Sequence, residues 1–235
     1  MALEPQRARV ISLESIAHET ILLRLAPEVA LPYRAGQFIT LRIPQVDGKL
    51  VGRSYSIASR RGVNEIDLII KLVAGGQGSD YVRSLQAGDE VLFMGPFGKF
   101  VLPEMSQSRA LFAGTGSGIG PFVPMIDELL AFTTTAVTLL AGYRHDQDVI
   151  ASLPLAEWQA FGERFTHITT LSQSTDAWTG SRGRVTDYLA SNPGLFDGSD
   201  VFICGNGSMV AEVKVLAEQA GVPAGQVFLE KYNNL

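Results

Sequence analysis

The sequence predicts two domains: an antiparallel β-barrel in residues 1–103, followed by an α/β domain with a parallel sheet in residues 104–235. Short apolar segments separated by turn residues fill the first part of the chain, which is typical of a barrel. From residue 110 onward, apolar segments alternate with helical ones, which favours a parallel sheet. Pro103 and the polar stretch up to Ser108 separate the two patterns, and 235 residues are enough for two hydrophobic cores.

Six barrel strands are expected, because six segments rich in Val, Ile, Leu, Phe and Thr end at Gly, Pro, Asp or Asn. They cover residues 7–12, 19–25, 37–43, 54–59, 65–72 and 90–96. Asp47-Gly48 and Ala87-Gly88-Asp89 mark two of the turns. One helix is expected at residues 79–85, where Ser79 would cap the first turn.

The second domain is expected to alternate five strands with four helices. The strands cover residues 110–113, 137–142, 165–171, 201–204 and 227–230. The first helix follows a glycine-rich turn and runs through Leu130, and the others cover residues 155–161, 184–190 and 208–220. This order predicts parallel strands joined by crossover helices.

Cysteine and histidine usage limits the chemistry of the chain. Cys204 is the single cysteine, so an internal disulfide is excluded, and so is an iron–sulfur cluster, which needs about four ligands. The three histidines stand alone without metal-ligand spacing, so we expect no metal site. Redox chemistry would then depend on an organic cofactor.

Charge and hydropathy indicate where the protein works and what it meets. Residues 1–103 carry a net charge of +2 and residues 104–235 a net charge of −7. Neither half is basic enough for a nucleic-acid binder, whereas the mildly basic first half suits a small acidic protein partner. No apolar run approaches the roughly 20 residues of a membrane span, and residues 1–10 lack a signal-peptide pattern. We therefore expect a cytoplasmic protein.

The first candidate site is Arg53-Ser54-Tyr55-Ser56 in a barrel strand. A flavin needs an aromatic face against its ring, a hydrogen-bond partner near its N5 and a cation for its phosphates, and Tyr, Ser and Arg supply these. Strand alternation places Arg53 and Tyr55 on one face and Ser56 on the other. The alternative is an ordinary barrel strand with an exposed arginine.

Two glycine-rich segments precede predicted helices. In Gly75-Gly76-Gln77-Gly78-Ser79, backbone N–H groups and a helix N-terminus suit a pyrophosphate, although a loop that needs positive φ would look the same. The second segment, residues 113–122, follows a strand and has glycines at 114, 116, 118 and 120. That spacing differs from G-x-G-x-x-G, yet the strand-to-helix context indicates a dinucleotide. Pro121 and Pro124 suit a first helical turn.

Two further segments lie at the ends of predicted strands. Cys204-Gly205-Asn206-Gly207-Ser208-Met209 joins a strand to a helix, and strand carboxyl ends are where such sheets bind ligands. The alternative for Cys204 is a small buried core residue. The chain closes on Glu230-Lys231-Tyr232-Asn233-Asn234-Leu235, for which a frayed end is the alternative.

Taken in order, these motifs resemble the ferredoxin–NADP reductase superfamily over nearly the whole chain. Its R-x-Y-S, G-x-x-S and C-G-x-x-x-M motifs match Arg53 to Ser56, Gly76 to Ser79 and Cys204 to Met209. Its G-T-G-x-x-P-F loop resembles Gly114 to Phe122 with one extra residue, and its closing E-x-aromatic matches Glu230 and Tyr232. The resemblance implies FAD in the barrel and a nicotinamide dinucleotide in the α/β domain.

The resemblance also implies roles for individual residues. Tyr55 would pack on the flavin, Ser56 would hydrogen-bond near N5, Cys204 would lie against the nicotinamide, and Tyr232 would cover the other flavin face. The implied catalytic residues are Ser56, Cys204, Glu230 and Tyr232. The implied cofactor-binding residues are Arg53, Ser54, Tyr55, Ser56, Ile70, Lys71, Gly76, Gln77, Gly78, Ser79, Gly114, Thr115, Gly116, Gly118, Pro121, Arg144, Ser172, Arg184, Cys204, Gly205, Met209 and Tyr232.

One departure from the family pattern concerns the coenzyme. NADPH-using relatives often carry Ser-Arg after the third strand of this domain, with the arginine on the 2′-phosphate, and here the pair is Ser172-Gln173. Arg144 and Arg184 remain in segments that resemble phosphate-binding positions, and a glutamine cannot replace the charge of an arginine. We expect NADP, with NAD possible.

A second departure is the lack of an iron–sulfur domain, so a one-electron acceptor would be a separate molecule. The resemblance implies a reductase that passes electrons between NAD(P)H and ferredoxin or flavodoxin, with Arg60 and Arg61 as candidate docking charges or as plain surface arginines. Two alternatives share the motifs: a flavin reductase or oxygenase reductase component, and an electron-transfer subunit of a larger complex.

Overall fold

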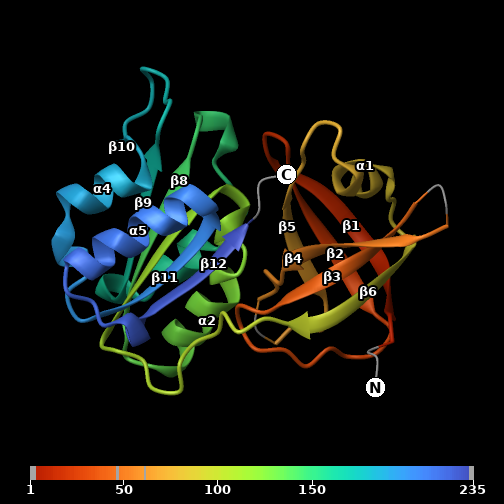
Figure 1. The fold of residues 1–235 in the computed structure, drawn as a ribbon, viewed down its shortest axis with the longest axis horizontal. Coiled ribbons are helices and arrows are strands. Elements are labelled where there is room, and N and C mark those ends of the chain that lie inside the picture. Colours follow the sequence, from red (N-terminus) through yellow and green to blue (C-terminus); the bar gives the residue numbers. More distant parts are fainter. Residues whose placement is uncertain (1–3, 46–47, 61, 233–235) are drawn as a thin grey trace.

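The computed structural model describes residues 4–45, 48–60 and 62–232, which form two six-stranded sheets lying side by side (Figure 1). The first is antiparallel throughout, with strand order β4-β3-β6-β1-β2-β5. Its strands are β1 (Gln6–Ala17), β2 (Thr20–Pro27), β3 (Phe38–Pro44), β4 (Leu50–Ser56), β5 (Ile66–Lys71) and β6 (Glu90–Phe97), with helix α1 (Gln77–Ser84) after β5. An isolated bridge between Ile57 and Leu68 brings the two edge strands together. The expected antiparallel barrel is confirmed.

Alternation of apolar and polar residues builds the barrel interior. In β3, Ile39, Leu41 and Ile43 are buried while the residues between them are partly exposed. β5 is buried along almost its whole length, and its one buried carboxylate, Asp67, accepts two hydrogen bonds from Arg24 on β2. This pairing satisfies the charge that burial would otherwise penalise.

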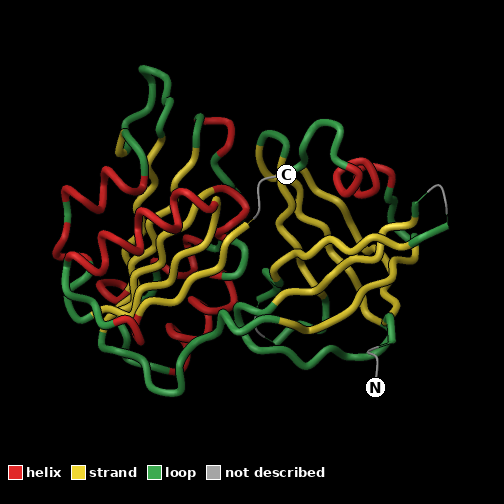
Figure 2. The backbone as a smooth tube through the Cα atoms, in the orientation of Figure 1, coloured by secondary structure: helices red, strands yellow, loops and turns green. Residues whose placement is uncertain are grey.

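The second sheet is parallel throughout, with strand order β10-β9-β8-β7-β11-β12. Helices cover both of its faces (Figure 2). The strands are β7 (Arg109–Thr115), β8 (Ala136–Tyr143), β9 (Phe165–Leu171), β10 (Ser181–Arg182), β11 (Ser199–Asn206) and β12 (Val227–Tyr232). The helices are α2 (Phe122–Phe132), α3 (Leu155–Gln159), α4 (Val185–Ser191) and α5 (Gly207–Gln219). The expected α/β fold is therefore confirmed.

Adjacent residues of the central strands pack into hydrophobic cores on opposite faces of the parallel sheet. Phe112 of β7 stacks on Phe202 of β11 with ring centroids 4.7 Å apart, under α2. The preceding residues, Leu111 and Val201, pack on the other face under α4 and α5. Strands buried on both faces read as continuous apolar runs, which is the pattern that the sequence shows here.

Several elements differ from expectation, among them β1, which covers Gln6–Ala17 rather than residues 7–12. The fourth barrel strand covers Leu50–Ser56 rather than residues 54–59, because β3 pairs with it from Pro44 onward. Helix α1 begins at Gln77 with Gly76 as its N-cap, so Ser79 is the third helical residue and does not cap the first turn. The two-residue strand β10 was not predicted, since it is too short to carry a periodic pattern.

An arginine of the barrel joins the two domains. The Arg60 guanidinium donates to both carboxylate oxygens of Asp127 on α2, at 2.9 and 3.2 Å, and also binds Glu157 on α3. Trp158 Nε1 donates to Asp127 at 2.7 Å. Arg60 is therefore engaged within the chain, which corrects its interpretation as a docking charge; Arg61 lies outside the described residues. None of the described helices has the length and apolar character of a membrane-crossing helix.

Candidate functional site

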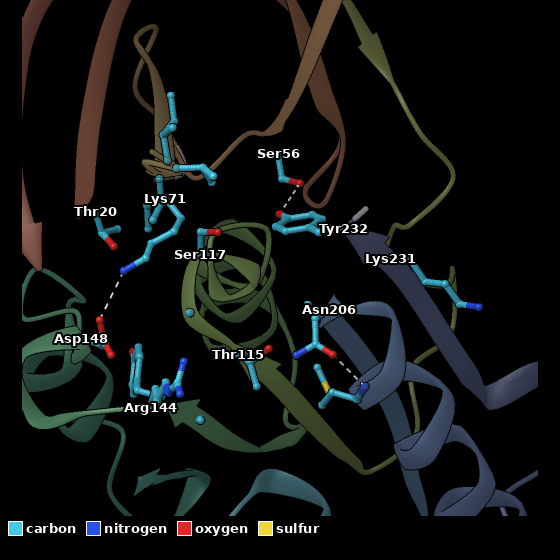
Figure 3. A pocket seen from close by; sticks show the side chains of 18 of the residues that line it. Thr20, Ser56, Lys71, Thr115, Ser117, Arg144, Asp148, Asn206, Lys231 and Tyr232 are labelled. Carbon is cyan, nitrogen blue, oxygen red and sulfur yellow. Dashed lines mark hydrogen bonds and ion pairs between the residues drawn. The ribbon is translucent and has the colours of Figure 1, made fainter. Parts of the chain in front are cut away.

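A cleft of about 1410 Å³ lies between the barrel and the carboxyl ends of the parallel strands. Barrel strands β4 and β5 and the start of α1 form one wall, and the ends of β7, β8, β11 and β12 form the other (Figure 3). Ligands of open parallel sheets bind at these carboxyl ends. The position and size of the cleft suit an extended ligand that touches both domains.

Most of the predicted site residues line this cleft. They are Arg53, Ser54, Tyr55, Ser56, Ile70, Lys71, Gly76, Gln77, Gly78, Ser79, Thr115, Gly116, Arg144, Ser172, Arg184, Gly205, Met209, Glu230 and Tyr232. The cleft lining does not include Gly114, Gly118, Pro121 or Cys204. The topology thus brings together motifs that stand up to about 180 residues apart in the chain.

Two motifs of the barrel meet at Gly78. A Cβ at this position would lie 3.0 Å from the Tyr55 hydroxyl and 3.2 Å from Cγ of Arg53, so a larger residue would push the glycine loop off β4. Among the described residues, the Arg53 guanidinium donates one hydrogen bond, to the neighbouring Gly52 carbonyl, and its remaining donors are open to a ligand. The wall therefore offers an aromatic side chain and a cation side by side.

The loop before α1 presents backbone donors to the cleft. The first intrahelical bond runs from Asp80 N–H to the Gly76 carbonyl, so the N–H groups of Gln77, Gly78 and Ser79 have no helical partner. The Ser79 hydroxyl oxygen accepts a hydrogen bond from Val73 N–H at 2.8 Å, which fixes the loop. This end of the helix suits a phosphate group.

The second glycine-rich segment has a largely internal role. A Cβ on Gly114 would lie 2.6 Å from Phe122, and a Cβ on Gly118 would lie 2.6 Å from the Cys204 carbonyl oxygen. Both glycines permit close packing, which explains why neither lines the cleft. Gly116 has a φ of +54° and open space around it, and Pro121 is the N-cap of α2. Only Thr115, Gly116 and Ser117 of this segment reach the cleft.

A hydrogen-bonded cluster joins the domains at the centre of the cleft. Ser56 Oγ donates to Glu230 Oε2 at 3.0 Å and lies 2.8 Å from the Tyr232 hydroxyl (Figure 3). Because an ionised carboxylate only accepts, the Ser56 proton points to Glu230 and Tyr232 donates to Ser56. Burial raises the pKa of Glu230, and the hydrogen bond from Ser56 opposes that rise. Burial likewise raises the pKa of Tyr232.

Cys204 lies behind this cluster rather than in the cleft. Its side chain is fully buried, and the Tyr232 hydroxyl is its hydrogen-bonding neighbour. Burial raises the pKa of the thiol well above its ordinary value, and the nearby Glu230 adds to the rise, so Cys204 is a neutral thiol. β11 and β12 pair Cys204 with Glu230 in register, which places both at the same level of the sheet.

Two arginines line the far end of the cleft. Arg144 follows β8, and its Nε donates to Gln173 Oε1 at 3.1 Å. Arg184 precedes α4 and lines the same region with Ser172. Arg182, in the same segment, instead donates to Ser174, Asp176 and Trp178 in the loop before β10.

A second bridge crosses the cleft, and no sequence motif predicted it. Lys71 of β5 donates to the His18 carbonyl at 2.7 Å and to Asp148 Oδ1 at 3.3 Å (Figure 3). The His18 N–H donates to the Gln147 carbonyl at 2.8 Å. These residues come from a barrel turn and a loop after β8, so only the fold brings them together. Thr20, His145 and Glu212 also line the cleft and belonged to no predicted motif, whereas Ser117 and Asn206 lie inside the predicted segments 113–122 and 204–209.

Comparison with known proteins agrees with this architecture. Residues 7–102 match the model of the oxidoreductase FAD-binding domain, and residues 112–214 match that of the oxidoreductase NAD-binding domain. The chain is 32% identical over 241 residues to ferredoxin–NADP reductase B of Sorangium cellulosum, covering 98% of both proteins. It is 28% identical to the reductase component DmpP of a Pseudomonas phenol 2-monooxygenase, covering 86% of this chain and 58% of that longer protein.

A solved structure gives the same result. The cytochrome P450 reductase GcoB of Amycolatopsis matches 97% of this chain and 70% of its own, with a TM-score of 0.87 and 28% identity. Fold, cleft and relatives together define a flavin-dependent oxidoreductase that uses a nicotinamide dinucleotide and works in electron transfer. The chain belongs to the ferredoxin–NADP reductase superfamily.

Proposed function

We propose that this protein transfers a hydride between NADPH and FAD bound in the cleft, and exchanges single electrons with a small acidic carrier such as ferredoxin or flavodoxin. The observation that carries the proposal is the Ser56–Glu230–Tyr232 cluster. It lies where the barrel wall meets the carboxyl ends of β11 and β12, so a ligand of each domain would meet there.

The barrel wall fits FAD by its own chemistry. Tyr55 offers a half-buried ring beside the open donors of Arg53. The free N–H groups at the start of α1 and the Arg53 guanidinium would hold the pyrophosphate. Bound FAD would supply the exchange of a hydride for single electrons. Ile70 and Lys71 lie on β5 across the same wall, where the ring edge would be held.

The residues at the centre of the cleft would orient the bound rings and supply or accept a proton. Ser56 would turn its hydroxyl from Glu230 toward the reacting ring nitrogen, which is a proton position that a serine reaches by rotation alone. Glu230, whose pKa is raised by burial, would hold or receive a proton at its carboxylate. Tyr232 covers Cys204 and would move aside when the nicotinamide enters, so that the two rings approach within about 3–3.5 Å.

Arg144 and Arg184 would bind the phosphates of NADPH. An arginine binds phosphate with two parallel hydrogen bonds, and two of them in one lining give a strong preference for a dianion. Arg182 would not contribute, because three acceptors of its own loop hold it. This arrangement favours NADP over NAD.

The acceptor would dock at a second, smaller opening of about 330 Å³ behind Glu230, lined also by Phe38 and Lys99. Glu230 lines both this opening and the cleft, so a carrier could reach the centre without displacing the nucleotide. Lys99 and Lys231 are exposed, and within the described part of the chain neither forms an ion pair. Lys231 points away from the cluster (Figure 3). Lys99 at this largely apolar opening, with Lys231 exposed at the neighbouring edge of the cleft, suits an acidic partner.

Charge reversal tests this docking proposal. Lys99→Glu should raise KM for a purified acidic [2Fe–2S] ferredoxin about five- to tenfold at low ionic strength, and the difference should shrink in high salt. The rate of flavin reduction by NADPH should stay unchanged. Lys214→Glu on α5 is the control for a charge reversal outside this opening, and Glu218→Lys is combined with it to preserve the Lys214–Glu218 pair. An unchanged KM for ferredoxin at low salt would exclude this opening as the docking site.

A second candidate function is the reductase component of an oxygenase. The monooxygenase reductase DmpP, 28% identical to this chain, favours it. Its electron acceptor would be the oxygenase or its ferredoxin rather than a general carrier. Tight retention of FAD during purification would argue against a further variant, a reductase of free flavin.

A further inference from the structure

The loop that connects β9 to β10 lies beside the end of the cleft lined by Arg144 and Arg184, and hydrogen bonds hold it in place. Figure 1 shows it projecting from the sheet edge. Arg182 donates to Ser174 Oγ at 2.6 Å and to the carbonyls of Trp178 and Asp176 at 2.8 and 3.4 Å. From the other side, Asp146 accepts hydrogen bonds from the backbone N–H and hydroxyl of Thr175, both at 3.0 Å. These hydrogen bonds restrain the loop from two sides and so fix the position of Gln173 at its start.

In this position Gln173 forms two hydrogen bonds with Arg144. Its side-chain oxygen accepts from Arg144 Nε at 3.1 Å, and its backbone N–H donates to the Arg144 carbonyl at 2.8 Å. Its carbonyl oxygen lies 3.0 Å from Nδ1 of His145. Gln173 itself does not line the cleft, whereas Arg144 and Ser172 do. Among the described residues that line the cleft, His145 is contacted by the backbone of Gln173 and Arg144 by its side chain, so whatever that side chain contributes to ligand binding acts through Arg144.

The contact with Gln173 determines which N–H donors of Arg144 remain available to a ligand. An arginine has five N–H donors, and the bond to Gln173 uses the one on Nε. Within the part of the chain that the structure describes, the terminal amino groups of Arg144 have no partner and are available to a phosphate. Because the amide is neutral, it fixes the guanidinium without cancelling its charge, and a fixed donor loses less conformational freedom on binding.

We propose that Gln173 is a positioning residue that sets the preference of this protein for a 2′-phosphorylated nucleotide over its unphosphorylated counterpart. The proposal rests on the NADPH assignment made above for the same end of the cleft. At this position the charge on the phosphate comes from Arg144 and the geometry from Gln173. Arg182 acts one step further back, by holding the loop that presents Gln173.

Calorimetric binding of 2′-phospho-AMP and 5′-AMP to the purified holoprotein tests the proposal without a catalytic readout. Gln173→Ala should reduce the affinity ratio of the two ligands about three- to tenfold by weakening 2′-phospho-AMP alone. Gln173→Glu keeps the acceptor but neutralises Arg144, so it should reduce the ratio more than Gln173→Ala. Arg144→Ala should abolish most of the preference, and Gln219→Ala on α5 is the matched control. In steady-state kinetics, Gln173→Ala should raise the KM for NADPH, whereas the KM for NADH and the kcat with either nucleotide should stay at their wild-type values.

The possible results distinguish a failure of the NADPH assignment from a failure of the role proposed for Gln173. A wild-type protein that binds both ligands equally overturns the NADPH assignment and this inference with it. If Arg144→Ala lowers the ratio but both Gln173 variants keep the wild-type value, the NADPH assignment stands and the role of Gln173 is wrong. A parallel loss of both ligands in Gln173→Ala would show a purely structural contribution and would also overturn the inference.

Discussion

Removing Arg60 should loosen the contact between the two domains. Its guanidinium binds Asp127 through two hydrogen bonds, and Asp127 has a side chain only 9% exposed, whereas that of Arg60 is 40% exposed. In Arg60→Ala, Asp127 would keep one donor, Trp158 Nε1, and would carry a poorly compensated charge. Breaking a fully buried pair costs about 3–5 kcal/mol. Since water reaches the arginine, we discount this to about 2 kcal/mol.

The second partner of Arg60 should matter much less. The Glu157 side chain is 65% exposed, and exposed pairs contribute about 0–1 kcal/mol. Glu157→Gln should therefore leave stability nearly unchanged. For a chain of this size, a loss of about 2 kcal/mol corresponds to a Tm lower by roughly 4–8 °C.

Thermal unfolding of the FAD-loaded protein measures both effects. Arg7→Ala is the matched control, because the Arg7–Glu90 pair is exposed on both sides and its loss should lower Tm by about 4 °C at most. Asp127→Asn combined with Arg60→Ala should cost less than the two single changes added together, since both remove the same contact. The reasoning fails if Arg60→Ala lowers Tm no more than Arg7→Ala does.

Three further predictions concern the centre of the cleft. Ser56→Ala should slow flavin reduction by NADPH about tenfold or more in stopped-flow traces while FAD stays bound; loss of FAD on purification would refute the role of Ser56. Burial raises the pKa of Glu230, so the folded state favours its protonated form, and this stabilisation is lost as pH rises through the raised pKa. Glu230→Gln should accordingly be more stable than the wild type at pH 8 in chemical denaturation, with the gap closing toward pH 4.5, and a constant gap would contradict the assignment. Cys204 should resist iodoacetamide in the native protein and react in Tyr232→Ala, and equal labelling of both proteins would show that Tyr232 does not cover the thiol.

Local patterns predicted most of the fold. Segments rich in Val, Ile, Leu, Phe and Thr between turn residues located the barrel strands, and continuous apolar runs such as residues 110–113 located the central strands of the parallel sheet. The misplaced fourth strand shows the limit of this reasoning. The segment Leu50–Ser56 contains Gly52 and Arg53 and has weak strand character, and its pairing with β3 decides its extent.

The site was predictable where a motif is local. Arg53 to Ser56 and Gly76 to Ser79 line the cleft together, although Ser79 serves the loop rather than the helix cap. Gly114 and Gly118 are glycines for packing reasons that only the neighbouring strand and helix reveal. The role of Arg60 and the bridge from Lys71 to Asp148 depend on contacts between distant segments, and such contacts leave no periodic or motif signal in the sequence.

The most direct test of the central claim is an anaerobic stopped-flow experiment on the purified yellow protein. It is mixed with NADPH and, separately, with NADH while the flavin absorbance is recorded. Hydride transfer in the cleft predicts fast bleaching with NADPH and slower bleaching, or a much higher half-saturating concentration, with NADH. A protein that retains FAD but is bleached by neither nucleotide would contradict the account. The hypothesis of a subunit that needs a larger complex would then replace it.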